Sequence, residues 1–300
     1  MSSNVRRRKK ISLARETVEK NPWLSKRAVA KHFGIARSTL YLKSKRKEKD
    51  KLLLAQVLAV MDQHPGYGKG RIAPAMGRDI KLVRRIMNKY GLKVQRAKKR
   101  PRKPKDLGKA ASDIPNRIKG LCPLRPDVVW VGDFTFLDFY GCFVYLATVL
   151  DRFTREIIGW SIGLHHTAQL VLDALEDAKR KRGPPKIFHS DQGSEYDSVL
   201  CRAWLLAEHI LPSQSHKAHP WENGHQESFF GRFKAELGNL YRFDTLDELI
   251  EAIHRQIHYY NTARIHTALK MTPKQKYEQA VTIWKISEKN NQKHLSTGVS

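Results

Sequence analysis

Three runs of β-branched and aromatic residues follow one another in residues 128–163, which read VVWVGDFTFLDFYGCFVYLATVLDRFTREIIGWSIG. The runs cover residues 128–137, 143–150 and 156–163, and turns that contain glycine or aspartate separate them. Runs of this composition between turn residues are typical of strands. We therefore predict three consecutive strands at the start of a sheet.

Helical and extended patterns alternate after this stretch. We predict a helix that begins at Thr167 and ends before residues 183–185 (GPP), a strand over 186–190, a helix over 198–208, a fifth strand at 210–211 and a helix over 222–237. The order βββαβαβα corresponds to a three-layer α/β arrangement with a mixed sheet. Residues 245–260 begin with a capping box and predict a further helix whose apolar stripe packs in the core.

The charge of the chain is unevenly distributed. Lys plus Arg is 56 and Asp plus Glu is 29, a net charge of +27. Residues 1–110 hold 33 basic and 7 acidic residues (net +26), whereas residues 111–300 hold 23 and 22 (net +1). A basic excess confined to one segment favours a nucleic-acid partner.

Composition excludes several other classes of protein. No uncharged run reaches the roughly 20 apolar residues that a membrane helix needs, and charged residues interrupt the segment after the basic N-terminus, so no signal peptide is indicated. The three cysteines lie far apart and suggest neither a disulfide framework nor a zinc finger. We expect a cytoplasmic protein without a membrane partner.

Residues 25–43, SKRAVAKHFGIARSTLYLK, predict two short helices with Gly34 as the turn between them and Ser25 as the cap of the first. This is a helix-turn-helix layout, and its second helix would present one set of side chains to DNA. That set is Arg37, Ser38, Thr39, Tyr41 and Lys43. A small helical hairpin with a solvated basic face is the alternative, and the single sign of the surrounding charge favours DNA binding.

The chain between this motif and the strands has two parts. Residues 51–92 predict more helices, which form either a second DNA-binding subdomain or simply a packed helical one. Residues 93–126 are a basic, proline-broken linker whose candidate phosphate contacts are Lys98, Lys99, Arg100, Arg102 and Lys103. The predicted domains are 1–50 (helix-turn-helix), 51–92 (second helical DNA-binding subdomain), 93–126 (linker), 127–280 (α/β core) and 281–300 (C-terminal tail).

Three carboxylates fall where the predicted sheet would gather them. Asp133 lies in the first strand, Asp191 at the end of the fourth and Glu227 on the helix that follows. Open α/β sheets bind ligands at strand ends, and three acids in one cleft repel one another unless a cation joins them. Carboxylates select Mg²⁺ or Mn²⁺, and two such ions can hold the attacking and leaving oxygens of a phosphoryl displacement. On spacing alone, solvated surface or turn acids are an equally good interpretation.

The segments around these acids are GDFTF, HSDQGSEY and ENGHQESFFGRFKAE, and they resemble the three motifs of the DDE transposase and retroviral integrase superfamily. Between Asp191 and Glu227 lie 35 residues, a separation typical of that group, and Lys234 stands seven residues after Glu227, where the family usually has a basic residue near DNA. The motifs GYGKGRIA, VYLATVLDRFTREIIGWSI and YYNTARIHTALKMTPKQKY extend the resemblance, over about residues 65–277, to OrfB-type insertion-sequence transposases.

This resemblance implies a ribonuclease H-like integrase catalytic core in which Asp133, Asp191 and Glu227 bind two Mg²⁺ (or Mn²⁺) ions. It implies cleavage and joining of double-stranded DNA at element ends and target, a homo-oligomer on DNA, a possible upstream accessory protein and a bacterial, nucleoid-associated location. The sequence departs from the family at Glu222-Asn223, where relatives often have Asp before the Asn, and it lacks the His/Cys zinc domain of retroviral integrases. The rival hypotheses are a structure-specific nuclease of the same fold and a DNA-binding regulator whose core has lost catalysis.

Other polar residues near the acids have alternative roles. Asp138, Asp151 and Glu222 are competing acids, although Asp151, at a strand end, is expected to cap a turn. His189 and His225 either act in proton transfer or DNA contact or form structural hydrogen bonds, whereas Arg264 and His266 either contact phosphates or brace the catalytic helix.

Overall fold

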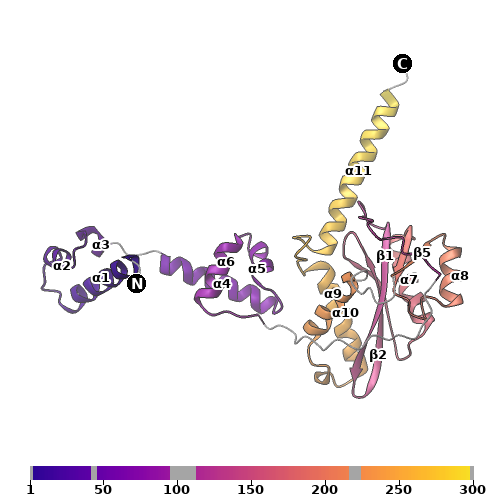
Figure 1. The fold of residues 1–300 in the computed structure, drawn as a ribbon, viewed down its shortest axis with the longest axis horizontal. Coiled ribbons are helices and arrows are strands. Elements are labelled where there is room, and N and C mark those ends of the chain that lie inside the picture. Colours follow the sequence, from indigo (N-terminus) through magenta and orange to yellow (C-terminus); the bar gives the residue numbers. More distant parts are fainter. Residues whose placement is uncertain (1–2, 42–45, 95–112, 216–223, 298–300) are drawn as a thin grey trace. The chain divides into compact units, whose positions relative to one another are not determined.

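The structure is a computed structural model of the 300-residue chain, and it describes residues 3–41, 46–94, 113–215 and 224–297. The chain forms two compact units, residues 1–58 and 59–300 (Figure 1). Within the described parts, no helix is both long and apolar enough to cross a bilayer.

The first unit is helical. It contains α1 (Ser3–Lys20), α2 (Lys26–His32), α3 (Arg37–Tyr41) and the start of α4 (Arg46–Gln63). Gly34, with φ +62°, forms the predicted turn between α2 and α3, and Arg15 Nη2 donates to the Thr39 carbonyl at 2.6 Å, which ties α1 to α3. Ser25 stands at the N-cap as predicted, but its hydroxyl accepts no capping hydrogen bond; only its carbonyl serves the helix, accepting from Val29 N at 3.0 Å.

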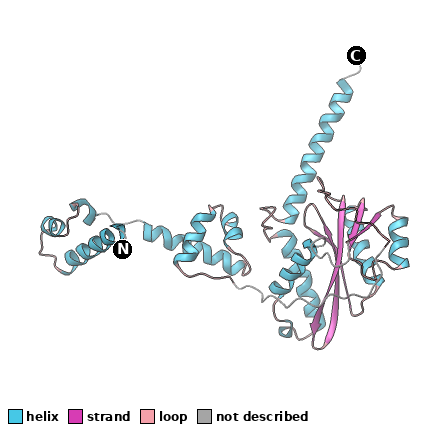
Figure 2. Ribbon diagram, in the orientation of Figure 1, coloured by secondary structure: helices cyan, strands magenta, loops and turns pink. Residues whose placement is uncertain are grey.

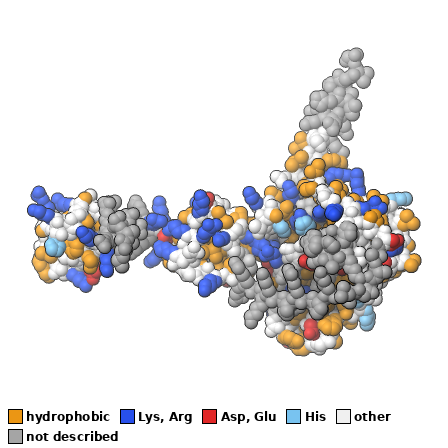
Figure 3. All heavy atoms as spheres, in the orientation of Figure 1, with side chains coloured by type: hydrophobic (Ala, Val, Ile, Leu, Met, Phe, Trp, Pro, Cys, Tyr) orange, Lys and Arg blue, Asp and Glu red, His pale blue; other side chains and the backbone are white. Residues whose placement is uncertain are grey.

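The second unit begins with a short helical pair, α5 (Lys69–Ala75) and α6 (Ile80–Lys89). Asp79 caps α6 by accepting from Lys81 N, and Gly91, with φ +65°, follows its end as predicted. Ile72 and Val83 are fully buried between the helices. In the face shown in Figure 3, basic side chains predominate over acidic ones on α4, α5 and α6.

A five-stranded mixed sheet forms the centre of this unit (Figure 2). Its strands are β1 (Val129–Phe139), β2 (Cys142–Asp151), β3 (Ile157–Gly163), β4 (Ile187–Ser190) and β5 (Leu211–Gln214), in the order β3-β2-β1-β4-β5. The first three strands pair antiparallel, and β4 pairs parallel with both β1 and β5. The predicted mixed sheet and its α/β fold class are therefore confirmed.

Helices cover both faces of the sheet. They are α7 (Ala168–Arg182), α8 (Val199–Ala207), α9 (Gly224–Leu237) and α10 (Leu246–Thr262), with a 3-10 turn, η2 (Leu240–Arg242), before α10. The last helix, α11 (Pro273–Thr297), contacts α10 and extends away from the sheet (Figure 1). One apolar cluster joins α7 and α8 to the sheet, and another joins α9 and α10 to it, as the buried Leu175 and Phe233 illustrate. Residues 281–297, assigned to a tail by the sequence analysis, continue α11.

Candidate active site

Asp133 stands on β1 opposite Thr148 of β2. Its carboxylate accepts a hydrogen bond from Phe134 N at 2.8 Å, which favours the ionised form. Burial, the charge of Asp191 and, more weakly, the charge of Glu227 outweigh that bond and raise the pKa of Asp133 to about 8. The three acids predicted from sequence are therefore close enough to interact electrostatically.

Asp191 reaches this place because β4 runs parallel to β1. Val131 pairs with His189, so Asp191, the first residue after β4, comes to lie beside Asp133, which is still within β1. The Asp191 carboxylate accepts from Gly193 N at 3.0 Å, which orients it at the end of the strand. The parallel pairing thus brings together two acids that lie 58 positions apart in the chain.

Gln226 determines where α9, and with it Glu227, meets the sheet. The Gln226 side chain is fully buried; its Nε2 donates to the Val131 carbonyl at 2.6 Å and its Oε1 accepts from Thr148 Oγ1 at 3.2 Å. Both partners adjoin Asp133, one two residues before it on β1 and one opposite it on β2. The first turn of α9, where Glu227 lies, is therefore anchored beside the other two acids.

Gln226 was not among the residues predicted to matter, although the helical pattern of α9 contained a signal for it. The buried face of α9 is made by positions 226, 229, 230, 233 and 237, a helical period in which Gln226 is the one polar member. A polar residue on an otherwise apolar helix face is expected to have a buried hydrogen-bond partner.

The three acids do not form a closed ligand set. Among the residues that the structure describes, no three His, Cys, Asp or Glu side chains come close enough together to hold a metal ion. The donor set nevertheless fits a hard cation, since it consists of carboxylate oxygens. Burial and two like charges oppose ionisation of Asp133, and a divalent cation would relieve that cost.

Lys234 lies two turns after Glu227 on the same face of α9. Its Nζ donates to the Phe136 carbonyl of β1 at 2.7 Å and stands 5.0 Å from the centre of the Phe136 ring. In this arrangement the side chain helps to hold α9 on β1. Its contact with DNA stays a prediction.

The competing acids have structural roles where they are described. Asp151 is fully buried and accepts from Thr154 N at 2.6 Å and from Asp127 N at 2.8 Å, so its predicted role as a turn cap is confirmed. Asp138 accepts from Gly141 N at 3.2 Å in the turn between β1 and β2. Glu222 lies outside the described residues.

The three histidines and Arg264 differ in how far their side chains are buried and hydrogen-bonded. His189 is fully buried, with Nδ1 2.9 Å from Ser213 Oγ, a structural hydrogen bond, whereas His225 is exposed at the start of α9. Arg264 is 1% exposed, and its Nε donates to both carboxylate oxygens of Glu236, at 2.9 and 3.1 Å, so it braces α9. His266 forms a β-bridge with Met271, and its pKa falls to about 4, chiefly through burial.

Two motifs that the sequence analysis quoted separately are packed together. Tyr67, of GYGKGRIA, is 1% exposed; its hydroxyl accepts from Ile265 N at 2.6 Å and donates to the Ala263 carbonyl at 3.3 Å. His64 Nδ1 lies 2.8 Å from the hydroxyl oxygen of Tyr259. The segment before α5 is thereby attached to the end of α10.

Apart from Lys234, the predicted DNA-contact residues fall into two groups. Arg37, Ser38 and Tyr41 are exposed on α3 and Thr39 is half-buried there. The others lie outside the described residues: Lys43, Lys98, Lys99, Arg100, Arg102 and Lys103.

The chain is similar to known proteins over most of its length. Two family models described as integrase core domain match residues 123–220 and 208–273. The transposase for insertion sequence element IS904 of Lactococcus lactis subsp. lactis (strain IL1403) is 31% identical over 246 residues, which cover 79% of this chain and 97% of that protein. The transposase for IS629 of Shigella sonnei is 31% identical, covering 79% and 82%. Among solved structures, the HTLV-2 integrase catalytic core domain in complex with magnesium covers 51% of this chain and 98% of its own, at 22% identity and a TM-score of 0.45.

Proposed function

This chain belongs to the insertion-sequence transposases with an integrase core domain, and we propose that it cleaves DNA at the ends of a mobile element and joins those ends to target DNA. One observation carries the proposal beyond family membership. Asp133 on the central strand β1, Asp191 just after β4 and Glu227 in the first turn of α9 lie close enough together to interact electrostatically.

In the proposed mechanism these three acids hold Mg²⁺ or Mn²⁺, two ions per site. A metal ion held by these acids would supply Lewis acidity at the phosphoryl oxygens and would make water a better nucleophile at neutral pH. The first reaction hydrolyses one strand at the element end and leaves a 3′-hydroxyl; in the second, that hydroxyl attacks a target phosphodiester. Each step forms one P–O bond and breaks another at the same phosphorus.

The protein's own residues orient this centre. Phe134 N holds the Asp133 carboxylate, Gly193 N holds that of Asp191, and Gln226 fixes the helix turn that carries Glu227. Such preorganisation matters because phosphoryl transfer depends on positioning and charge stabilisation rather than on a side-chain nucleophile.

DNA recognition belongs, in this proposal, to the basic N-terminal part of the chain. Arg37, Ser38, Thr39 and Tyr41 read a major groove from α3, while the basic residues outside the described ranges, together with Lys234, contact phosphates. The protein acts as a homo-oligomer on paired element ends, with or without an upstream accessory protein, at the bacterial nucleoid.

The test is incubation of the purified full chain with labelled element-end DNA and Mg²⁺, read for site-specific nicks and joined products. We expect Asp133→Asn, Asp191→Asn and Glu227→Gln each to abolish both products while DNA affinity changes less than about twofold. Asp138→Asn, which removes a carboxylate from an exposed turn, is the matched control and should retain activity. Pre-cut element ends test joining separately from cleavage. A protein that nicks element-end DNA but forms no joined product from pre-cut ends would be a nuclease. DNA binding with no metal-dependent product would identify a regulator.

A further inference from the structure

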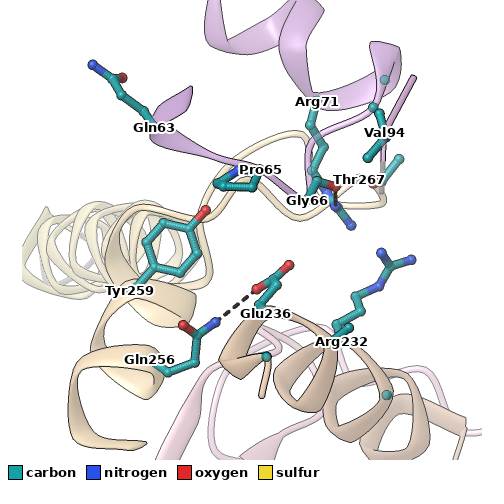
Figure 4. A pocket seen from close by; sticks show the side chains of 15 residues that line it. Gln63, Pro65, Gly66, Arg71, Val94, Arg232, Glu236, Gln256, Tyr259 and Thr267 are labelled. Carbon is teal, nitrogen blue, oxygen red and sulfur yellow. Dashed lines mark hydrogen bonds between the residues drawn. The ribbon is translucent and has the colours of Figure 1, made fainter. Parts of the chain in front are cut away.

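A cavity of about 980 Å³ lies along α9 in the unit formed by residues 59–300 (Figure 4). Its wall is built from the segment before α5, from α5 itself, from α9 and from α10, and it includes Pro65, Arg71, Arg232, Glu236 and Tyr259. In Figure 4, Arg71 of α5 and Arg232 of α9 approach from opposite sides, and their guanidinium groups point toward one another. Two positive charges that face the same open space repel each other unless an anion lies between them.

Arg71 is an unusual residue in this wall, because it is buried and not all of its N–H groups are hydrogen-bonded. It is 6% exposed, its Nε has no hydrogen-bond partner, and its Nη1 makes only a long bond of 3.5 Å to the Gly66 carbonyl. Burial, followed by the charges of Arg264 and Arg232, lowers the pKa of Arg71 to about 10. A buried guanidinium with an unpaired N–H is costly unless an acceptor completes it.

The carboxylate of Glu236, in the same wall, is already engaged. It accepts from Arg264 Nε at 2.9 and 3.1 Å and from Gln256 Nε2 at 3.0 Å. Its charge therefore balances that of Arg264. Within the described ranges, no carboxylate forms an ion pair with Arg71 or Arg232, which leaves two positive charges at the cavity.

The cavity is adjacent to the proposed catalytic centre. Gly231 lines it and follows Glu227 by four residues on α9, which is about one helical turn, or about 6 Å along the axis. A Cβ on Gly231 would meet no heavy atom within 4 Å, so the helix surface there is open. A DNA strand that passes Glu227 would next reach this opening.

We propose that the cavity binds a phosphate group of the DNA backbone between the guanidinium groups of Arg71 and Arg232, close to the strand held at the acids. Guanidinium groups suit this ligand, because their fixed forks of N–H donors match phosphate oxygens and their charge persists at any physiological pH. That the phosphate belongs to DNA rather than to a free anion rests on the proposed function. The cavity would then hold the strand in register while the adjacent phosphodiester reacts.

The test measures binding of a fluorescein-labelled element-end duplex to the full chain by anisotropy, in EDTA and over a series of NaCl concentrations. Each duplex phosphate contact contributes about 0.9 to the slope of log K against log[salt]. Arg232→Gln should therefore lower the slope by about 0.9 and weaken binding about eightfold at 0.1 M NaCl, since ten to the power 0.9 is about eight. Contacts elsewhere on the chain add to the slope independently, so they do not mask this change.

Two matched variants separate a local contact from a general loss of charge. Arg232→Lys keeps the charge and should keep most of the slope. Arg180→Gln removes an exposed arginine from α7, on the opposite face of the sheet, and should leave the slope unchanged. Arg71→Gln should reproduce the effect of Arg232→Gln, provided that its urea unfolding curve matches that of the wild-type chain.

The proposal is overturned if Arg232→Gln binds with the wild-type slope, or if Arg180→Gln loses as much. It is also overturned if inorganic phosphate binds the wild-type chain but not Arg232→Gln while the two proteins bind DNA with equal slope, because the site would then belong to a free anion. Binding is measured in EDTA, where no metal-dependent chemistry occurs, so it is independent of nicking. If the slope changes as expected but the nicking assay in Mg²⁺ fails, only the proposed function is refuted. An unchanged slope with normal nicking refutes only the phosphate site.

Discussion

Replacement of Gln226 by Met tests whether one buried amide positions the catalytic helix. Methionine preserves the length and approximate volume of the side chain, so no large cavity forms. It removes the hydrogen bond from Nε2 to the Val131 carbonyl, at 2.6 Å, and the one that Oε1 accepts from Thr148 Oγ1, at 3.2 Å. Both partners lie against a side chain that is 0% exposed, so water cannot replace the lost amide.

The expected cost follows from these two bonds. A typical intramolecular hydrogen bond contributes about 1 kcal/mol, and a buried group left without a partner costs about 1–3 kcal/mol. Gln226→Met should therefore lower the free energy of unfolding by about 2–4 kcal/mol. Glu227 should lose its position as well, so nicking should fall further than the unfolded fraction explains.

Urea unfolding followed by tryptophan fluorescence measures this change, because five of the six tryptophans lie after residue 58. Gln169→Met is the matched control, since Gln169 is exposed and bonds only to Asp173, at 2.8 Å; we expect a change below about 0.5 kcal/mol. The anchoring role of Gln226 is refuted if the free energy of unfolding of Gln226→Met lies within about 0.5 kcal/mol of that of the wild type. It is equally refuted if nicking by the folded variant is undiminished.

Three further predictions follow from burial. Because the pKa of Asp133 is raised to about 8, Mg²⁺ binding should displace a proton, and the apparent affinity for Mg²⁺ should rise with pH up to about 8. Calorimetry in two buffers of different ionisation enthalpy measures this proton release, and no release at pH 7 would contradict the prediction. The pKa of His266 is about 4 in the folded chain and 6.5 in the unfolded chain, so the unfolded chain protonates first as the pH falls. The stability present above pH 6.5 is therefore lost progressively down to about pH 4. His266→Gln should lose less stability than the wild type between pH 7 and pH 4.5 in urea titrations, and an equal loss in both proteins would contradict this. A Cβ on Gly159 would stand 2.2 Å from the Ala174 carbonyl oxygen, whereas one on Gly70 would meet nothing within 4 Å. Gly159→Ala should therefore lower the free energy of unfolding in urea by at least about 1–3 kcal/mol, while Gly70→Ala should leave it unchanged or raise it. Equal effects of the two substitutions would show that close packing at Gly159 is not the cause.

Local sequence pattern was sufficient for most of the secondary structure. The strands β1, β2 and β3 begin and end within two residues of the predicted limits, because β-branched runs and turn residues act over a few positions. The caps behave likewise: Thr167 and Thr245 each accept from the backbone N three residues on, as expected of helix starts. Helix α1 was not predicted, since its few apolar residues are interspersed with charged ones and form no stripe.

The amino-acid sequence alone determined the order of strands and helices, the basic N-terminal segment and the identity of the three candidate acids. Only the tertiary structure decided that Asp191 emerges beside Asp133, that Gln226 anchors the turn carrying Glu227, and that Arg71 faces Arg232 across a cavity. The physical reason is the range of the interactions. Periodicity and capping depend on neighbours within about four residues, whereas a parallel strand pair, a buried amide and converging charges exist only after distant segments have packed and excluded water.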